Sequence, residues 1–231
     1  MKLRFLYLTV FLLYLLARSA AAETLLIVGD SLSAAYGIPV ETGWVALLQQ
    51  QLAAEHPGWK IVNASISGDT TANARARMPQ TVSTHQPDIV VLELGGNDGL
   101  RGLSLEAMQD NLAAMIELAQ KNDAGVLLVG VDLPPNYGPR YTEKFRAVYQ
   151  SVATEFQVAL LPSLLDGVGT RTDLMQTDGI HPNGKAQARI AARVLEYLEP
   201  LLKRTQGTPG QDQPHFDGYG GIGSSFQISR L

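Results

Sequence analysis

The sequence predicts an α/β fold in which helices cover both faces of a doubly wound, parallel, five-stranded sheet, giving a three-layer α/β/α sandwich. Short apolar runs rich in β-branched residues alternate with longer segments of helical period after residue 22. The runs in the middle of the chain are apolar at nearly every position, which is typical of strands buried on both faces. Polar motifs follow these runs, and such sheets bind ligands at the carboxyl ends of their strands. A functional site is therefore expected at that edge.

Five strands are predicted, each from a short apolar run. The first contains Leu25–Val28 and the third contains Ile89–Leu92, and neither run is interrupted by a polar residue. The predicted strands span residues 24–29, 60–65, 88–94, 125–131 and 157–161.

Five helices are predicted, one after each strand. In the first, Trp44, Leu47 and Leu48 follow the i, i+3, i+4 spacing of a stripe that faces the core. The third has the same spacing between Leu105 and Ala119. The predicted helices span residues 42–56, 73–84, 104–122, 140–155 and 183–202.

Residues 1–22 are predicted to be a signal peptide that is absent from the mature protein. A basic start, Met1–Arg4, precedes an apolar stretch, Phe5–Leu16, and Ala20–Ala22 supply the small residues before a cleavage site. The apolar stretch is shorter than the roughly 20 residues that span a bilayer, which favours cleavage over a retained anchor. No cysteine follows it, so a lipoprotein anchor is excluded. We expect an exported bacterial protein, periplasmic or secreted, without a stable membrane anchor.

The mature chain is predicted to hold one domain at 23–204 and a tail at 205–231. The tail is rich in Gly and Gln and lacks helical period, so we expect it to be disordered, whether native or an artificial addition. Losing three basic residues with the signal peptide takes the net charge from −4 to −7, which argues against nucleic-acid binding. Without cysteine the chain has no disulfides or thiolate metal sites. We expect a monomer that acts on a small molecule.

Ser31 follows the first predicted strand, in the run Gly29-Asp30-Ser31-Leu32. A serine where a strand turns into a helix is well placed for a nucleophile, because helix N-terminal amides stabilise negative charge on a reacting oxygen. The alternative is a helix entry in which Asp30 or Ser31 only caps free amides. The run lacks the Gly-x-Ser-x-Gly elbow, which disfavours the α/β-hydrolase fold.

Asp178 and His181 lie three residues apart in Asp-Gly-Ile-His-Pro, close enough for the carboxylate to reach Nδ1 of the imidazole. That contact would leave Nε2 free to act as a base. The alternative is an Asp turn followed by a histidine that caps the last predicted helix. Of the four histidines, His181 alone combines a carboxylate at this spacing with a place at the active edge of the sheet.

Two glycine-containing loops follow the second and third strands. Gly68 lies in the first and Asn97 in the second, within Gly95-Gly96-Asn97-Asp98. Glycine lets the backbone approach a ligand closely, and Asn97 carries a side-chain amide donor. With the Ser31 amide they would form an oxyanion hole of three donors. The alternative for each loop is a turn that needs positive φ.

In chain order, these four segments match the four sequence blocks of the GDSL, or SGNH, hydrolase superfamily: Gly29-Asp30-Ser31-Leu32, Gly68, Gly95-x-Asn97-Asp98 and Asp178-x-x-His181. With Asp132–Gly138, the chain resembles its bacterial exported acyl-CoA thioesterase, lysophospholipase and arylesterase group. The resemblance implies a flavodoxin-like sheet and hydrolysis without a metal or organic cofactor. It also implies Ser31 as nucleophile, His181 and Asp178 as the other triad members, and the amides of Ser31, Gly68 and Asn97 as oxyanion donors.

We therefore expect an esterase that cleaves ester and thioester bonds of medium- to long-chain acyl substrates. The alternatives are a carbohydrate O-acetylesterase of the same superfamily and a non-catalytic ligand-binding module. Candidates for the acyl pocket, which are equally compatible with an ordinary core, are Leu100, Leu133, Pro134, Tyr137 and Ile180.

Other charged residues near the expected site receive lesser roles. We expect Asp30 to cap or orient, and Asp69 and Asp98 to bond nearby backbone amides. Arg75, Arg77 and Arg101 are interpreted as solvated surface charge, with contact to an anionic substrate group as the alternative.

Overall fold

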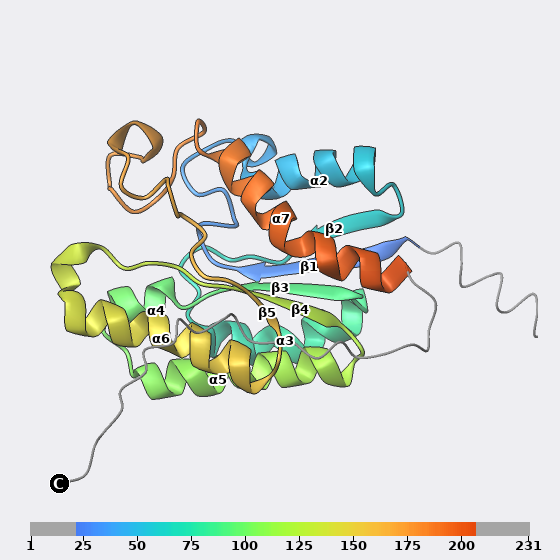
Figure 1. Cartoon of the computed structure of the whole chain (residues 1–231), viewed down its shortest axis with the longest axis horizontal. Helices are drawn as coiled ribbons and strands as arrows, with labels where there is room; N and C mark the ends of the chain where they lie inside the picture. Colours follow the sequence, from blue (N-terminus) through green and yellow to red (C-terminus); the bar gives the residue numbers. More distant parts are fainter. Residues whose placement is uncertain (1–21, 207–231) are drawn as a thin grey trace, which may run out of the picture.

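A parallel five-stranded sheet with strand order β2-β1-β3-β4-β5 forms the middle layer of the protein (Figure 1). This computed structural model describes residues 22–206, so all but the last residue of the predicted signal peptide and the tail beyond Gln206 lie outside the described residues. The strands are β1 (Glu23–Gly29), β2 (Trp59–Asn63), β3 (Ile89–Glu93), β4 (Gly125–Val129) and β5 (Ala159–Leu161). The predicted fold class is confirmed.

Helices cover both faces of the sheet, because each crossover between parallel strands passes over one face (Figure 1). One face carries α2 (Trp44–Glu55) and α7 (Gln187–Gln206). The other carries α3 (Thr71–His85), α5 (Leu105–Lys121) and α6 (Pro139–Glu155).

The strands contribute alternate side chains to two separate cores. Leu25 and Ile27 of β1 pack with α2 and α7, whereas Leu26 and Val28 pack with α3, α5 and α6. All four side chains are fully buried, as the continuous apolar run of a doubly covered strand requires.

The winding of the sheet reverses at β1, which is hydrogen-bonded to β2 on one side and to β3 on the other. In open α/β sheets the crevice for a ligand lies at the carboxyl ends of the strands at such a reversal. Ser31 directly follows β1, and Asn97 follows β3 on a short helix, α4 (Gly96–Leu100). The topology therefore brings both residues to this crevice.

Two predicted boundaries differ from the structure near the site. The segment containing Asn97 was predicted as a loop, but it forms α4, whose N-cap Gly95 has a φ of +115°. The last helix begins at Gln187 and not at residue 183, because the side chain of Asn183 accepts a hydrogen bond from the Lys185 amide and forms a turn.

At its other end α7 continues to Gln206, two residues beyond the domain boundary predicted at 204. Short 3-10 turns that the sequence analysis did not predict lie at Val40–Thr42, Pro135–Tyr137 and Thr172–Leu174. No helix within residues 22–206 combines the length and the apolar character needed to cross a bilayer.

We expect the substitution Leu92→Ala to lower the free energy of unfolding by about 2–5 kcal/mol, because it leaves a cavity in a fully buried part of β3. Leu103→Ala is the matched control, since this leucine is 43% exposed and its loss should cost less than about 0.5 kcal/mol. Urea denaturation followed by circular dichroism measures both, and equal losses would contradict the assignment of Leu92 to the core.

Candidate active site

The structure brings Ser31, His181 and Asp178 into one hydrogen-bonded chain. The Ser31 Oγ lies 2.9 Å from Nε2 of His181, and Nδ1 of the same ring lies 2.7 Å from Oδ2 of Asp178. The other carboxylate oxygen of Asp178 accepts hydrogen bonds from the backbone amides of Ile180 at 2.9 Å and His181 at 3.0 Å. The carboxylate is thus fixed to the same turn as the imidazole that it orients.

Electrostatics favour one protonation pattern in this chain. Burial alone would raise the pKa of Asp178, but hydrogen bonds from the amide and ring of His181 and from the Ile180 amide outweigh it and lower the pKa to about 2. Asp178 is therefore ionised at neutral pH, and its carboxylate accepts a hydrogen bond from the N–H at Nδ1 of His181. With Nδ1 directed to Asp178, Nε2 is the ring nitrogen that faces the Ser31 hydroxyl.

The turn that carries Ser31 rests on a buried acid. Glu93, fully buried at the end of β3, accepts a hydrogen bond of 2.7 Å from the Ser33 hydroxyl and lies 3.5 Å from the Asp30 amide. A Cβ at Gly29 would lie 2.7 Å from Ser33 Oγ and 2.9 Å from Glu93 Oε2. Glycine is required there because the Ser33–Glu93 pair occupies the space behind the turn.

Two carboxyl groups are buried together under this turn. Burial, followed by the charge of Asp30, raises the pKa of Glu93 well above its ordinary value. Burial also raises the pKa of Asp30 to about 6, although the Leu32 amide, the His181 charge and Asn97 each lower it in part. The sequence analysis did not single out Glu93. The available signal was an acid inside a run predicted to be buried on both faces.

A side-chain amide joins the loop of Ser31 to the loop of His181. Nε2 of Gln176 donates to the carbonyl of Tyr36 at 2.8 Å and to the carbonyl of Pro182 at 3.1 Å. The Tyr36 ring also lies against the imidazole of His181, with 4.6 Å between the ring centroids. These contacts tie together two segments that are 150 residues apart in the chain. The sequence analysis missed both Gln176 and Tyr36.

A second glutamine, Gln187, also connects these two loops, and its side chain is buried. Oε1 of Gln187 accepts from the Trp44 amide at 3.0 Å, and its Nε2 lies 3.4 Å from the Pro182 carbonyl. The Trp44 indole in turn donates to the Leu32 carbonyl at 3.1 Å. The start of α2 therefore connects the residue after Ser31 with the residue after His181.

The three predicted oxyanion donors lie around the same crevice. Within residues 22–206, the backbone amides of Ser31 and Gly68 donate to no protein acceptor, and Gly68 has a φ of +86°. Asn97 Nδ2 donates to Asp30 Oδ2 at 3.1 Å and to the Asp69 carbonyl at 2.9 Å. Two amides are thus available to a substrate oxygen, whereas Asn97 must exchange one of its present acceptors for it.

Asp30 orients Asn97, in agreement with its predicted role, and it also accepts a hydrogen bond from the Leu32 amide at 3.0 Å. Asp98 accepts from the amide of Thr71 at 2.9 Å, so it joins α4 to the start of α3. The prediction for Asp69 was wrong, because its carboxylate pairs with a guanidinium group instead of backbone amides.

Of the three arginines interpreted as solvated surface charge, Arg75 and Arg101 are exposed in agreement with that interpretation, whereas Arg77 is partly buried in an ion pair. Arg77 holds the carboxylate of Asp69 with N–O distances of 2.8 and 2.9 Å. Arg75 donates to a side-chain amide on α5 at 3.1 Å. Arg101 donates to the backbone carbonyl of Gly68 at 3.0 Å. Each guanidinium therefore has a protein partner, and the partner of Arg101, Gly68, belongs to the candidate site.

The five residues predicted for an acyl pocket do not share one surface. Leu133 is only 7% exposed and packs in the core beside Gly99, so the ordinary-core alternative holds for this residue. Ile180 is 39% exposed next to His181. The others, Leu100, Pro134 and Tyr137, are partly buried.

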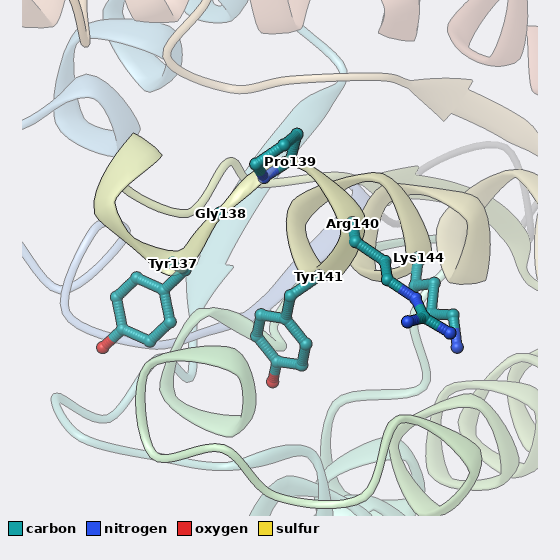
Figure 2. Close-up of a pocket in the computed structure, with 6 residues that line it drawn as sticks. All are labelled: Tyr137, Gly138, Pro139, Arg140, Tyr141 and Lys144. Carbon is teal, nitrogen blue, oxygen red and sulfur yellow. The ribbon is translucent and has the colours of Figure 1, made fainter.

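A pocket of about 330 Å³ lies beside α4 and is lined by Tyr137, Gly138, Pro139, Arg140, Tyr141 and Lys144 (Figure 2). Its two tyrosine rings are stacked, with centroids 6.2 Å apart and 27° between the ring planes. Their hydroxyls donate to carbonyls of α4, Tyr137 to Leu100 at 2.8 Å and Tyr141 to Gly99 at 3.3 Å. Ser31 and His181 do not line this pocket. The pocket is connected to the candidate site by α4, which carries Asn97.

One group of potential metal ligands occurs within residues 22–206, made of Glu55, His56 and Glu199. Glu199 already pairs with His56 and with Lys203, each at 2.9 Å. The group lies at the C-terminal end of α2, away from Ser31, so it has no part in the candidate site.

Comparisons with known proteins agree on one family. Residues 27–189 match the sequence model of the GDSL-like lipase/acylhydrolase family. The chain is 53% identical over 190 residues to the esterase TesA of Pseudomonas aeruginosa, covering 82% of this chain and 94% of that protein. It is 45% identical over 192 residues to the thioesterase 1/protease 1/lysophospholipase L1 of Escherichia coli, covering 83% and 91%. A crystal structure of TesA matches with a TM-score of 0.76 and 52% identity, over 78% of this chain and 99% of that chain.

The raised pKa of Asp30 has a consequence for stability. Because the pKa rises from 3.8 to about 6 on folding, the folded protein favours the protonated acid, and this group lowers the free energy of unfolding as pH rises between these values. Relative to Asp30→Asn, the wild type should lose up to about 3 kcal/mol between pH 4 and pH 7. Urea denaturation of both proteins at each pH measures the difference, and a difference independent of pH would contradict this assignment.

Proposed function

The chain belongs to the GDSL-like lipase/acylhydrolase family, and on this premise we propose that it is a serine hydrolase of carboxylic esters and thioesters with medium- to long-chain acyl groups. One observation carries the proposal. Ser31 Oγ lies 2.9 Å from a histidine whose other nitrogen is hydrogen-bonded to a carboxylate, and the backbone amides of Ser31 and Gly68 are free to donate. A nucleophile, a base and donors for an oxyanion are the parts that acyl transfer requires.

In the first half of the reaction, Nε2 of His181 takes the hydroxyl proton while Ser31 Oγ attacks the carbonyl carbon of the substrate. Asp178 stays ionised and stabilises the imidazolium that forms. The amides of Ser31 and Gly68 and the side chain of Asn97 hold the oxyanion of the tetrahedral intermediate. His181 then protonates the leaving alcohol or thiol, and an acyl-enzyme remains on Ser31.

In the second half, water replaces the leaving group in the crevice. His181 removes a proton from the water as it attacks the acyl carbonyl, and the same donors hold the second oxyanion. Collapse of this intermediate returns the proton to Ser31 Oγ and releases the fatty acid. The residues present suffice for both halves, without a metal or organic cofactor.

The preference for longer acyl groups is supported by the apolar side chains at this edge of the sheet. Within residues 22–206, the large apolar residues that are exposed all lie in segments that connect a strand to the next long helix, and they are Tyr36, Val40, Ile66, Leu103 and Ile180. Exposed apolar groups that gather in one region indicate a binding surface. A relative at 45% identity carries the names thioesterase and lysophospholipase, and these names agree with cleavage of acyl thioesters and acyl esters.

A carbohydrate O-acetylesterase remains the alternative within the same superfamily. It needs no apolar surface for an acyl chain, so the length of the preferred chain separates the two. A non-catalytic binding module would retain ligand affinity without turnover.

We further propose that the protein is exported, on the basis of the basic start and apolar stretch in residues 1–22.

The test is hydrolysis of p-nitrophenyl esters with two to sixteen carbons, by the wild type and by Ser31→Ala. We expect maximal kcat/KM at medium or long chains, and a loss of at least about 10⁴-fold in kcat for the variant, because the nucleophile is removed. Ser151→Ala, on the exposed side of α6, is the matched control and should keep wild-type activity.

Three results would redirect the proposal. Activity confined to acetate would favour the carbohydrate deacetylase. Near wild-type turnover by Ser31→Ala would exclude this serine as the nucleophile. An inactive wild type that still binds acyl ligands would favour the binding module.

A further inference from the structure

Arg101 lies at the end of α4 and reaches back to the candidate oxyanion hole. Its guanidinium NH2 donates to the Gly68 carbonyl at 3.0 Å and lies 3.4 Å from Oδ1 of Asn97. One guanidinium nitrogen thus faces both segments that carry the predicted oxyanion donors beyond Ser31. Within the described residues, the other two arginines near the site lie on α3, where one donates to Asn111 on α5 and the other to Asp69 in the loop before α3.

The cation fixes the orientation of the Asn97 side-chain amide. In the observed orientation, Oδ1 faces the guanidinium while Nδ2 faces the Asp30 carboxylate and the Asp69 carbonyl. The reversed amide would place its NH2 against a guanidinium donor, and its oxygen against two acceptors. Three favourable contacts would become unfavourable, so Arg101 and Asp30 together keep Nδ2 directed into the site.

The same guanidinium restrains Gly68. This glycine has a φ of +86°, a conformation available to glycine at little cost, and its amide is one of the two free donors of the site. A hydrogen bond to its carbonyl limits the rotation of the segment that aims this amide.

The charge of Arg101 acts in the same direction. Its positive charge faces Oδ1 of Asn97, and it polarises the amide so that Nδ2 becomes a stronger donor. No ion pair of Arg101 is found among residues 22–206, so no carboxylate neutralises this effect directly. Because the guanidinium is exposed, solvent weakens the effect of its charge. Arg101 therefore contributes to the site more through its hydrogen bonds than through its charge.

We propose that Arg101 is a positioning residue for the oxyanion hole, which orients the Asn97 amide and the Gly68 segment toward the developing oxyanion. The proposal rests on the proposed function as a serine hydrolase. It predicts an effect on the chemical step and little effect on substrate binding, because the donors that Arg101 orients act mainly in the transition state.

The test measures kcat and KM for Arg101→Gln and Arg101→Lys in the full chain, with the p-nitrophenyl ester that the wild type prefers. We expect Arg101→Gln to lower kcat by about 10–100-fold, less than the 10²–10³-fold typical for removal of a whole donor, with KM changed less than about threefold. Arg101→Lys keeps the charge but not the planar guanidinium, so its kcat should lie between those of the wild type and Arg101→Gln.

Arg189→Gln is the matched control. Arg189 also donates to the carbonyl of a glycine with positive φ, Gly167, at 3.0 Å, but it contacts no residue of the site. Its kcat should stay within about twofold of the wild type, as expected for a surface substitution away from the chemistry. Thermal unfolding of each variant identifies any loss that arises from folding, and Arg101→Lys carries the test if Arg101→Gln does not fold.

A double-mutant cycle with Asn97→Ala distinguishes positioning from independent action. If Arg101 acts through Asn97, Arg101→Gln should lower kcat less in the Asn97→Ala background than in the wild type. Unchanged kcat in both Arg101 variants, or a raised KM with unchanged kcat, would overturn the proposal while Ser31→Ala still lacks activity. An active Ser31→Ala would instead overturn the proposed function.

Discussion

The hydrogen bond between Ser31 and His181 is the interaction on which the site depends, and the chain cannot form it locally. Its partners lie 150 residues apart, one directly after the first strand and the other shortly before the last helix. The sheet supplies the coarse placement, because parallel strands end at one edge. The fine placement comes from Gln176, which donates to a carbonyl of each loop, and from the Tyr36 ring against the imidazole.

The same edge of the sheet carries an energetic cost. Asp30 and Glu93 are buried together below the Ser31 turn, and burial raises the pKa of both. Fold stability alone would not favour two neighbouring carboxyl groups in an apolar layer. They have a role at the site, because Glu93 supports the turn through Ser33, and Asp30 orients the Asn97 amide. We infer that this part of the fold gives up stability to hold donors in place.

The sequence was sufficient for the fold class and for the order of the elements, because those depend on periodicity and on strands that are apolar throughout. It also singled out Ser31, Asp178 and His181, which the structure brings into one hydrogen-bonded chain, because their spacing and their positions have a chemical meaning. It could not predict the contacts of Gln176 or Arg101, because their partners are backbone carbonyls of distant loops. Leu133 was left open between pocket and core, because residue type alone does not tell which apolar side chains a core encloses. The short helix α4 was missed because its five residues, which include Gly96 and Gly99, are too few and too poor in apolar side chains to show a helical period.

The central claim is that Ser31 is a nucleophile activated by His181, and covalent trapping tests it most directly. The full chain would be treated with a p-nitrophenyl alkylphosphonate, and the product examined by intact-mass and peptide mass spectrometry. We predict one adduct per chain on the peptide containing Ser31, formed far more slowly in His181→Ala. An adduct on another residue, or continued ester hydrolysis by a fully labelled protein, would contradict the claim.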